Sequence, residues 1–153
     1  MTDLSYLPEH LARLAQGFSP AQLQKLQRQM ATKLRREQSK RITAQQNVDG
    51  SSYEVRKPQR PKKGKRVRAK MMNTIKNAAH MRIKHRTGGF DIGYTGRMAQ
   101  IASVHQYGLT SRVDARRGTT AAYPVRELIG ISDENKQMLD EMMIEYFEGV
   151  FGK

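Results

Sequence analysis

The sequence predicts an α+β protein in which a small antiparallel sheet packs against helices. Apolar and polar residues alternate from Phe90 to Thr95, and a period of two is typical of a strand with one buried face. After Gly96 the period becomes helical and lasts until Gly108, a residue type that often ends helices. The apolar positions of this predicted helix are Met98, Ile101, Ala102 and His105.

We expect residues 1–46 to form an N-terminal helical hairpin. The leucines of its first helix have the spacing of a two-helix seam, and Gly17 ends that helix. They are Leu4, Leu7, Leu11 and Leu14. In the second helix Ser19 can act as the cap, Pro20 suits the first helical position and Gln22 completes a capping box. Its thin apolar line is Leu23, Leu26, Met30, Leu34 and Ile42. This line is expected to pair with the leucines, and the alternative is a basic helix lying on nucleic acid.

Residues 47–70 are predicted to form a basic loop or arm. Asp49 and Gly50 give the sharpest turn signal. From Arg56 to Lys70 nine basic residues are mixed with Pro58, Pro61 and Gly64, a composition that cannot bury a core. The stretch is either a solvated loop or an arm that becomes ordered on a partner chain or on DNA.

Residues 71–153 are expected to form the α+β core. Residues 67–80 have helical spacing, and residues 81–85 alternate and reach the strand at Phe90 through a glycine turn, which predicts a β-hairpin. We expect a loop over residues 109–120 and a short edge strand over 121–125, since Pro124 rules out a central one. The stretch Ile131-Ser132-Asp133 is expected to cap a last helix whose wide apolar face fits burial in the main core. That face contains Met138, Leu139, Met142, Met143, Tyr146, Phe147 and Val150.

The net charge of +14 is spread unevenly along the chain. Residues 54–70 carry nine basic side chains and one acidic side chain, whereas residues 131–153 carry two basic and six acidic ones. Either the protein binds a polyanion, or opposite ends of neighbouring copies attract each other.

The residue pattern predicts no catalytic, metal or cofactor site. Cysteine is absent, and none of the four histidines has a metal-binding spacing, so His105 is interpreted as a packing histidine. No apolar run approaches the roughly 20 residues of a membrane span, and the first residues do not resemble a signal peptide, so we expect synthesis in the cytoplasm. Tyr53 is the only aromatic residue near the basic stretch, which argues against a platform for stacking RNA bases.

Four blocks of residues stand in an order that resembles a known family. They are Gln46-Asn47-x-Asp49-Gly50-Ser51-x-Tyr53 with Arg56-Lys57, Gly93-Tyr94-x-Gly96-Arg97, Ile101-Ala102-x-Val104-His105-Gln106-x-Gly108, and Tyr123-Pro124-x-Arg126-Glu127-Leu128-Ile129-Gly130. In this order they resemble the phage virion-morphogenesis family, the tail-completion proteins (gene S product type) of contractile-tailed temperate phages, and the resemblance covers roughly residues 20–150.

This resemblance implies a structural virion protein without catalytic residues or cofactors. It would complete the phage tail at the head-proximal end and support head–tail joining, as a ring, usually hexameric, in the neck. Its partners would be other copies and adjacent tail-tube, sheath or neck-connector proteins, with transient contact to packaged DNA left open and no membrane. The alternative function is that of a basic nucleic-acid-binding protein without sequence specificity.

Two sets of residues follow from this interpretation. The positions expected to determine the fold are Asp49, Gly50, Gly93, Gly96, Arg97, His105, Gln106, Gly108, Pro124 and Arg126. Among them, His105 and Gln106 are expected to hydrogen-bond a neighbouring backbone where their helix ends. The candidate assembly residues are Arg56, Lys57, Arg60, Lys62, Lys63, Lys65, Arg66, Arg112, Arg116 and Arg117.

Overall fold

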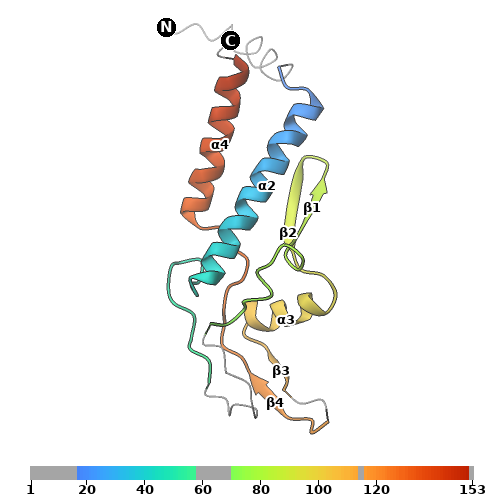
Figure 1. Cartoon of the computed structure of the whole chain (residues 1–153), viewed down its shortest axis with the longest axis vertical. Helices are drawn as coiled ribbons and strands as arrows, with labels where there is room; N and C mark the ends of the chain where they lie inside the picture. Colours follow the sequence, from blue (N-terminus) through green and yellow to red (C-terminus); the bar gives the residue numbers. More distant parts are fainter. Residues whose placement is uncertain (1–16, 58–69, 114–115, 152–153) are drawn as a thin grey trace, which may run out of the picture.

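Two long helices set the shape of the molecule. The computed structural model describes residues 17–57, 70–113 and 116–151. Helices α2 (Pro20–Thr43) and α4 (Asp133–Phe151) run side by side in opposite directions along the long axis (Figure 1). The body is therefore elongated (Figure 1).

Two small hairpins and a short helix complete the fold. The hairpin of β1 (Arg82–Arg86) and β2 (Gly89–Gly93) packs against α2. Helix α3 (Gly96–Gln106) lies crosswise beyond it, and β3 (Thr110–Arg112) pairs with β4 (Thr120–Ala122) at the far tip (Figure 1). The predicted α+β class is confirmed, with two separate two-stranded antiparallel sheets among the described residues where we expected a single sheet.

The start of α2 agrees with the sequence prediction. Ser19 Oγ accepts a hydrogen bond from Gln22 N at 3.2 Å, and Gln22 Oε1 accepts one from Ser19 N at 3.0 Å, with Pro20 in the first turn. This reciprocal pair is a capping box. Phe18, just before the cap, places its ring 4.8 Å from the ring of Phe147 on α4, so the chain entering α2 is also attached to the other long helix.

The buried side of α2 packs on elements far away in the sequence. Its buried residues are Leu26, Ala31, Leu34, Gln38 and Ile42. They belong to a helix that contacts α4 on one side and the β1–β2 hairpin on another. The helix expected to pair with it, with leucines from Leu4 to Leu14, lies outside the described residues.

The β1–β2 hairpin confirms the alternation seen in the sequence. Ile83 pairs with Ile92 and His85 pairs with Phe90, and the register leaves a two-residue turn in which Gly88 has φ +79°. A left-handed glycine suits such a tight turn. Phe90 and Ile92 are half-buried, whereas Asp91 between them is exposed, as a strand with one buried face requires.

Helix α3 ends as predicted at Gly108. This glycine has φ +64°, and Leu109 N donates to Val104 O at 2.9 Å, which together form a Schellman motif. A Cβ at this position would lie 2.8 Å from Val125 Cγ2. The site therefore demands glycine both for its backbone conformation and for space.

Two predictions about secondary structure were wrong. In the described part of the predicted helix 67–80, residues 70–80 form successive turns. Met72 has φ +61°, which interrupts a right-handed helix, and the backbone N–H and carbonyl groups of Asn77 bond within short turns. The predicted loop 109–120 contains strand β3, which alternation could not reveal because its three residues are polar. The predicted edge strand 121–125 corresponds to β4, which ends at Ala122 before Pro124.

The expected burial of α4 in the main core was also wrong. From 133 to 150 no side chain is buried, and Ile144 and Phe147 on the predicted helix are 55% and 39% exposed. The core lies instead where the end of α2 meets α3 and the chain after β4. Its buried members are Ile42, Tyr53, Ile75, Met81, Ala102 and Leu128. Helix α4 therefore packs on α2 and leaves a broad outer face free of core contacts.

Candidate assembly surfaces and the polar hub that supports them

The chain between β4 and α4 is held mainly by side chains. Residues 126–130 belong to no helix or strand. Their backbone groups are bound by side chains from α2, from α3 and from the loop after α2. We call the five side chains that anchor this chain the polar hub: Gln38, Arg41, Tyr53, Gln106 and Arg126.

Gln38 is the most deeply buried polar residue of the hub, at 1% exposure. Its Nε2 donates to Gly130 O at 2.8 Å, and its Oε1 accepts from Gly130 N at 3.2 Å and from Arg41 Nη2 at 2.7 Å. A weaker contact of 3.4 Å joins Nε2 to Asn135 Oδ1 on α4. Both donor and both acceptor positions of the amide are thus hydrogen-bonded, so its burial carries little desolvation cost.

Gln106 plays the same part from the end of α3. Its Oε1 accepts from Leu128 N at 2.8 Å and from Ile129 N at 3.1 Å, and its Nε2 donates to Ile129 O at 3.0 Å. We had expected this residue to bond a neighbouring backbone. Two glutamines, on different helices, thus bind backbone groups of residues 126–130 that would bond to a neighbouring strand if this segment were part of a sheet.

Arg41 and Tyr53 meet at the carbonyl oxygen of Glu127. Arg41 Nη1 lies 2.6 Å from that oxygen, and the Tyr53 hydroxyl lies 2.7 Å from it. The Glu127 carboxylate accepts from Val48 N at 2.8 Å, and Glu127 N donates to Asn47 Oδ1 at 3.0 Å. These bonds fasten the loop after α2 to the chain after β4.

Arg126 joins the hub to α3. It is 4% exposed and donates from Nε and Nη2 to Glu54 O at 3.1 and 2.9 Å. Its Nη1 lies 3.3 Å from His105 Nδ1, and because a guanidinium can only donate, this ring nitrogen is the acceptor. Burial, together with the charges of Arg126 and Arg56, lowers the pKa of His105 from 6.5 to about 4. The imidazole is therefore neutral at neutral pH, as expected for a packing histidine.

The other residues of the predicted fold-determining set are spread over the turns. Asp49 Oδ1 accepts from the Ser51 hydroxyl at 2.5 Å and from Ser51 N at 2.9 Å, and these two hydrogen bonds lower the pKa of Asp49. Gly50, the residue between them, has φ +83°. The remaining positions are Gly93 at the end of β2, Gly96 and Arg97 at the start of α3, and Pro124 beyond β4. The structure does not gather them into one site, and their role as fold determinants stays a prediction.

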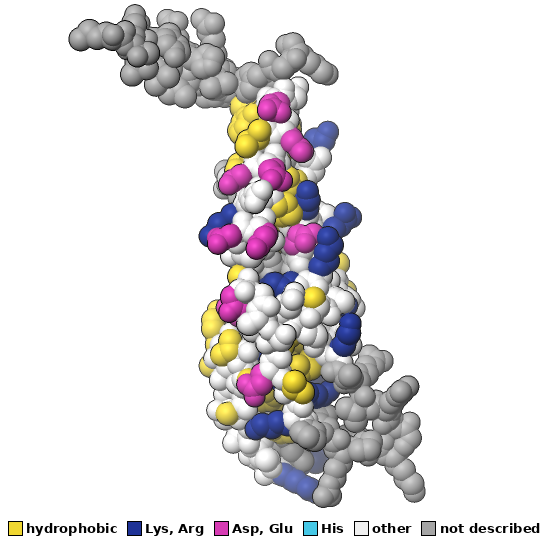
Figure 2. All heavy atoms as spheres, turned by 90° about the vertical axis from the view of Figure 1, so that its left-hand side faces the viewer, with side chains coloured by type: hydrophobic (Ala, Val, Ile, Leu, Met, Phe, Trp, Pro, Cys, Tyr) yellow, Lys and Arg dark blue, Asp and Glu magenta, His cyan; other side chains and the backbone are white. Residues whose placement is uncertain are grey.

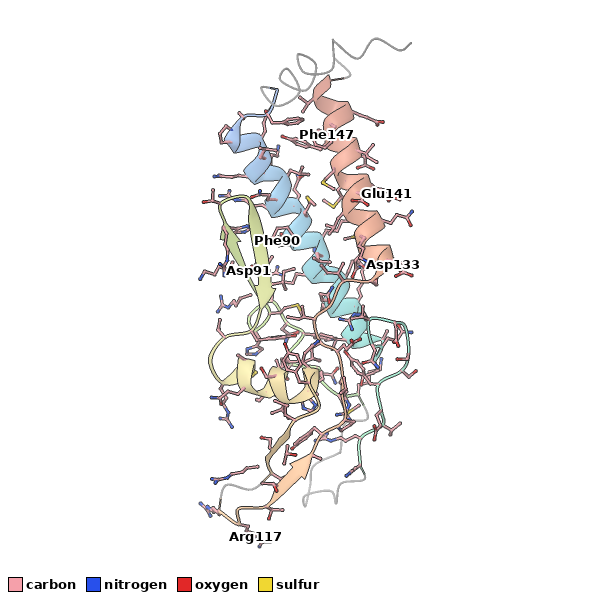
Figure 3. All side chains as sticks on the ribbon, turned by 180° about the vertical axis from the view of Figure 1, so that it is seen from behind. Phe90, Asp91, Arg117, Asp133, Glu141 and Phe147 are labelled. Carbon is pink, nitrogen blue, oxygen red and sulfur yellow. The ribbon has the colours of Figure 1, made fainter. Side chains whose placement is uncertain are left out.

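The candidate assembly residues fall into two groups at the lower end of the body. Arg56 and Lys57 are exposed and line a cavity of about 620 Å³, which Lys70 and the β3–β4 hairpin also line. Arg112 lies on β3, and Arg116 and Arg117 lie in the turn that follows, with Arg117 at the tip (Figure 3). Arg60, Lys62, Lys63, Lys65 and Arg66 lie outside the described residues.

The helix pair carries two stripes of opposite charge. Glu141, Glu145 and Glu148 are exposed on one side of α4, and we call them the acidic ridge. Figure 2 shows Asp and Glu side chains along the upper half of the molecule, with Lys and Arg side chains along their edge. On α2 a hollow of about 560 Å³ is lined by exposed cations and reaches Met142 on α4, and we call it the basic groove. Its exposed cations are Lys25, Arg28, Lys33, Arg36 and Lys40.

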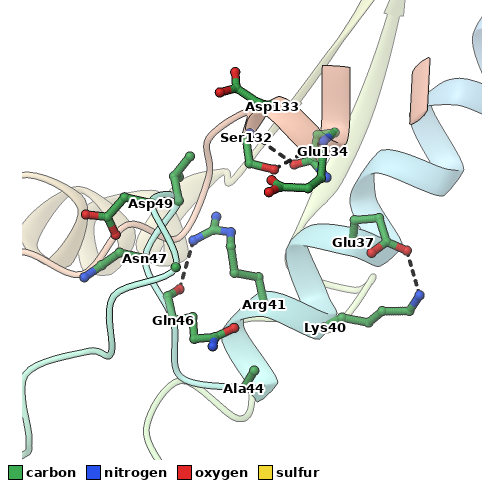
Figure 4. Close-up of a pocket in the computed structure, with 13 residues that line it drawn as sticks. Glu37, Lys40, Arg41, Ala44, Gln46, Asn47, Asp49, Ser132, Asp133 and Glu134 are labelled. Carbon is green, nitrogen blue, oxygen red and sulfur yellow. Dashed lines mark hydrogen bonds and ion pairs between the residues drawn. The ribbon is translucent and has the colours of Figure 1, made fainter. Parts of the chain in front are cut away.

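A further pocket lies where α4 begins (Figure 4). It has a volume of about 530 Å³, and its charged side chains already have partners. Lys40 Nζ lies 2.6 Å from Glu37 Oε1, Arg41 donates to Gln46 O at 3.1 Å, and Asp133 pairs with a lysine of its own helix. The arrangement is a polar hollow whose charged side chains are engaged by groups of the same chain.

The described residues hold no cluster of three or more His, Cys, Asp or Glu side chains that could bind a metal ion. Within the same part of the chain, no helix has the length and apolar character needed to cross a membrane.

Comparison with known proteins decides the family. Residues 2–148 match the model of the phage virion morphogenesis family. The chain is also 32% identical over 151 residues to tail completion protein S of Escherichia phage P2, covering 97% of this chain and 99% of that protein. This protein belongs to the phage virion morphogenesis family. No solved structure matches it.

Membership of the phage virion morphogenesis family confirms the resemblance that the four sequence blocks suggested. The third and fourth blocks supply Gln106 and Arg126, and the first supplies Tyr53. Sequence analysis missed Gln38 and Arg41, two polar residues of α2, of which Gln38 lies on the buried side of the helix. Gln38 could have been identified from its position, because it lies one helical turn after Leu34 and therefore on the same, buried side of α2.

Proposed function

We propose that this protein completes the phage tail at its head-proximal end and supports head–tail joining, as a ring in the neck of the virion. The observation that carries the proposal is the similarity to tail completion protein S, which extends over nearly the whole of both chains.

The architecture suits a subunit that assembles with its neighbours. The polar hub fixes the central body, while charged surfaces of opposite sign lie on different elements. Surfaces that differ from each other and attract each other form heterologous contacts, which close into rings when the rotation between copies permits. The number of copies in such a ring, expected to be six, belongs to the same proposal.

The basic stretch 54–70 is proposed to pack on an adjacent subunit or an adjacent ring. Arg56 and Lys57, in the described part of this stretch, are exposed and line the cavity of about 620 Å³. Limited trypsin digestion of free protein and of purified virions tests this. Protection of residues 54–70 in virions alone is expected, and equal cleavage in both would contradict the proposal.

A phage that lacks this protein tests the main proposal. We expect DNA-filled heads and tails of normal length that stay separate in electron micrographs. Adding purified protein to such an extract is expected to restore joined, infectious particles. Joined particles at wild-type yield without the protein would refute the function.

Purified protein separates this function from nucleic-acid binding. Any affinity for duplex DNA is expected to be weak and to disappear with modest salt, because contacts to phosphates alone depend steeply on salt. Tight DNA binding by a monomer at about 0.15 M salt, with no effect of the protein on tails, would favour the alternative.

A further inference from the structure

We propose that copies of this protein dock through the helix pair, with the acidic ridge of α4 in one copy seated on the basic groove of α2 in the next. The inference deepens the proposed ring assembly and rests on it. It is argued from the charges, the exposure and the level of the two stripes along the helices.

Both stripes face solvent within one copy. Glu141, Glu145 and Glu148 are exposed, and their spacing of four and three residues puts them on one side of α4. Ile144 stands beside them at 55% exposure and adds an apolar contact. Among the described residues, the ion pairs of α2 and α4 join neighbours on the same helix, as between Lys40 and Glu37.

The cations of the groove lie at the same levels as the acids of the ridge. The contact between Gln38 and Asn135 marks one level on the two antiparallel helices. Arg28 lies ten residues before Gln38, and Glu145 lies ten residues after Asn135, so each is about 15 Å from that level.

The next turn of each helix repeats the match. Lys25 and Glu148 each lie thirteen residues from the marked level, about 20 Å away, and Lys33 and Glu141 lie five and six residues from it. Rotation about an axis parallel to the helices keeps every residue at its level. In a ring with such an axis, the three acids of one copy therefore lie at the same levels as three cations of the next.

A second copy fits the groove better than nucleic acid does. DNA phosphates laid in the basic groove would run beside the acidic ridge of the same molecule (Figure 2). Another copy brings carboxylates at the spacing of the cations instead. Complementary stripes of this kind choose the partner and its register, and their attraction weakens with salt.

The test uses two charge-reversed forms of the full chain. In one, the ridge becomes basic through Glu141→Lys, Glu145→Lys and Glu148→Lys. In the other, the groove becomes acidic through Lys25→Glu, Arg28→Glu and Lys33→Glu. Light scattering and native mass spectrometry at low salt measure assembly, and circular dichroism checks that each variant folds. Triple replacement of the same acids by Gln gives a milder version for the case in which a reversal unfolds the chain.

We expect the wild type to assemble and each reversed form alone to associate at least tenfold more weakly. An equimolar mixture is expected to restore assembly, with both masses in the same particles. Restoration by mixing requires contact between different copies, because within each variant the two stripes now have the same sign.

Several results would overturn the inference. One is a wild type that stays monomeric at all concentrations. Another is assembly that the charge reversals do not change, which is the result expected if a segment of the same chain covers the groove. Loss of duplex DNA binding in the acidic-groove form, with assembly intact, would assign the groove to nucleic acid. The proposed function fails separately, if virions join without the protein whatever its oligomeric state.

Discussion

Replacing Gln38 by Met tests the polar hub most directly. Methionine has nearly the same length and a similar helix propensity, so the change removes hydrogen bonds and little else. Gly130 N and Gly130 O lose their side-chain partner, and Arg41 loses an acceptor. The exposed Gln29 on the same helix gives a matched control, since Gln29→Met alters no buried contact.

The expected cost is about 3 kcal/mol. A buried backbone group without a partner costs about 1 to 3 kcal/mol. The two groups that lose their partner belong to the half-buried Gly130, so about 1.5 kcal/mol is assigned to each. For a chain of this size that corresponds to a fall in the melting temperature of about 6 to 12 °C. Urea unfolding followed by circular dichroism, at one fixed protein concentration, measures the difference. If Gln38→Met and Gln29→Met lie within about 0.5 kcal/mol of each other, the hub does not stabilise the fold as argued.

Three further predictions concern α3 and the end of α4. Gly108→Ala is expected to lower the free energy of unfolding by about 2 to 3 kcal/mol, because the backbone is left-handed and the new Cβ would lie 2.8 Å from Val125. Gly149→Ala, in open space on a helix, is expected to raise it by up to about 1 kcal/mol. Thermal melts compare the two variants. Gln106→Glu keeps the acceptor but loses the donor, so its stability in urea titrations is expected to lie between those of the wild type and Gln106→Ala, with a loss of about 1 to 2 kcal/mol. A loss as large as that of Gln106→Ala would show that the donor dominates. As pH falls from 6.5 towards 4, His105 is protonated in the unfolded chain before it is protonated in the folded one, so the free energy of unfolding should drop by about 1 to 2 kcal/mol after allowance for solvent screening. His105→Asn keeps an acceptor and should remove this part of the pH dependence. If the variant loses stability with falling pH as steeply as the wild type, His105 is not the cause.

Local chemistry made several elements predictable from the sequence. The capping box at Ser19, the glycine turn before Phe90 and the end of α3 at Gly108 each depend on residues within a few positions of one another. The family also followed from the order of short blocks, because their residues are contiguous in the chain. Residues 70–80 show the limit of this reasoning. Their apolar residues have helical spacing, but the segment forms turns that bury Ile75.

The sequence by itself determined the start of α2, the turn between β1 and β2, the end of α3, the segregation of charge along the chain and the family. Only the tertiary structure decided that Gln38 and Arg41 hold residues 126–130, because the groups that they bind lie more than eighty positions away. It alone also placed the acids of α4 beside the cations of α2, at matching levels. The physical reason is that periodicity tells which side of a helix is apolar, whereas the identity of what covers each side depends on contacts between segments that no local pattern encodes.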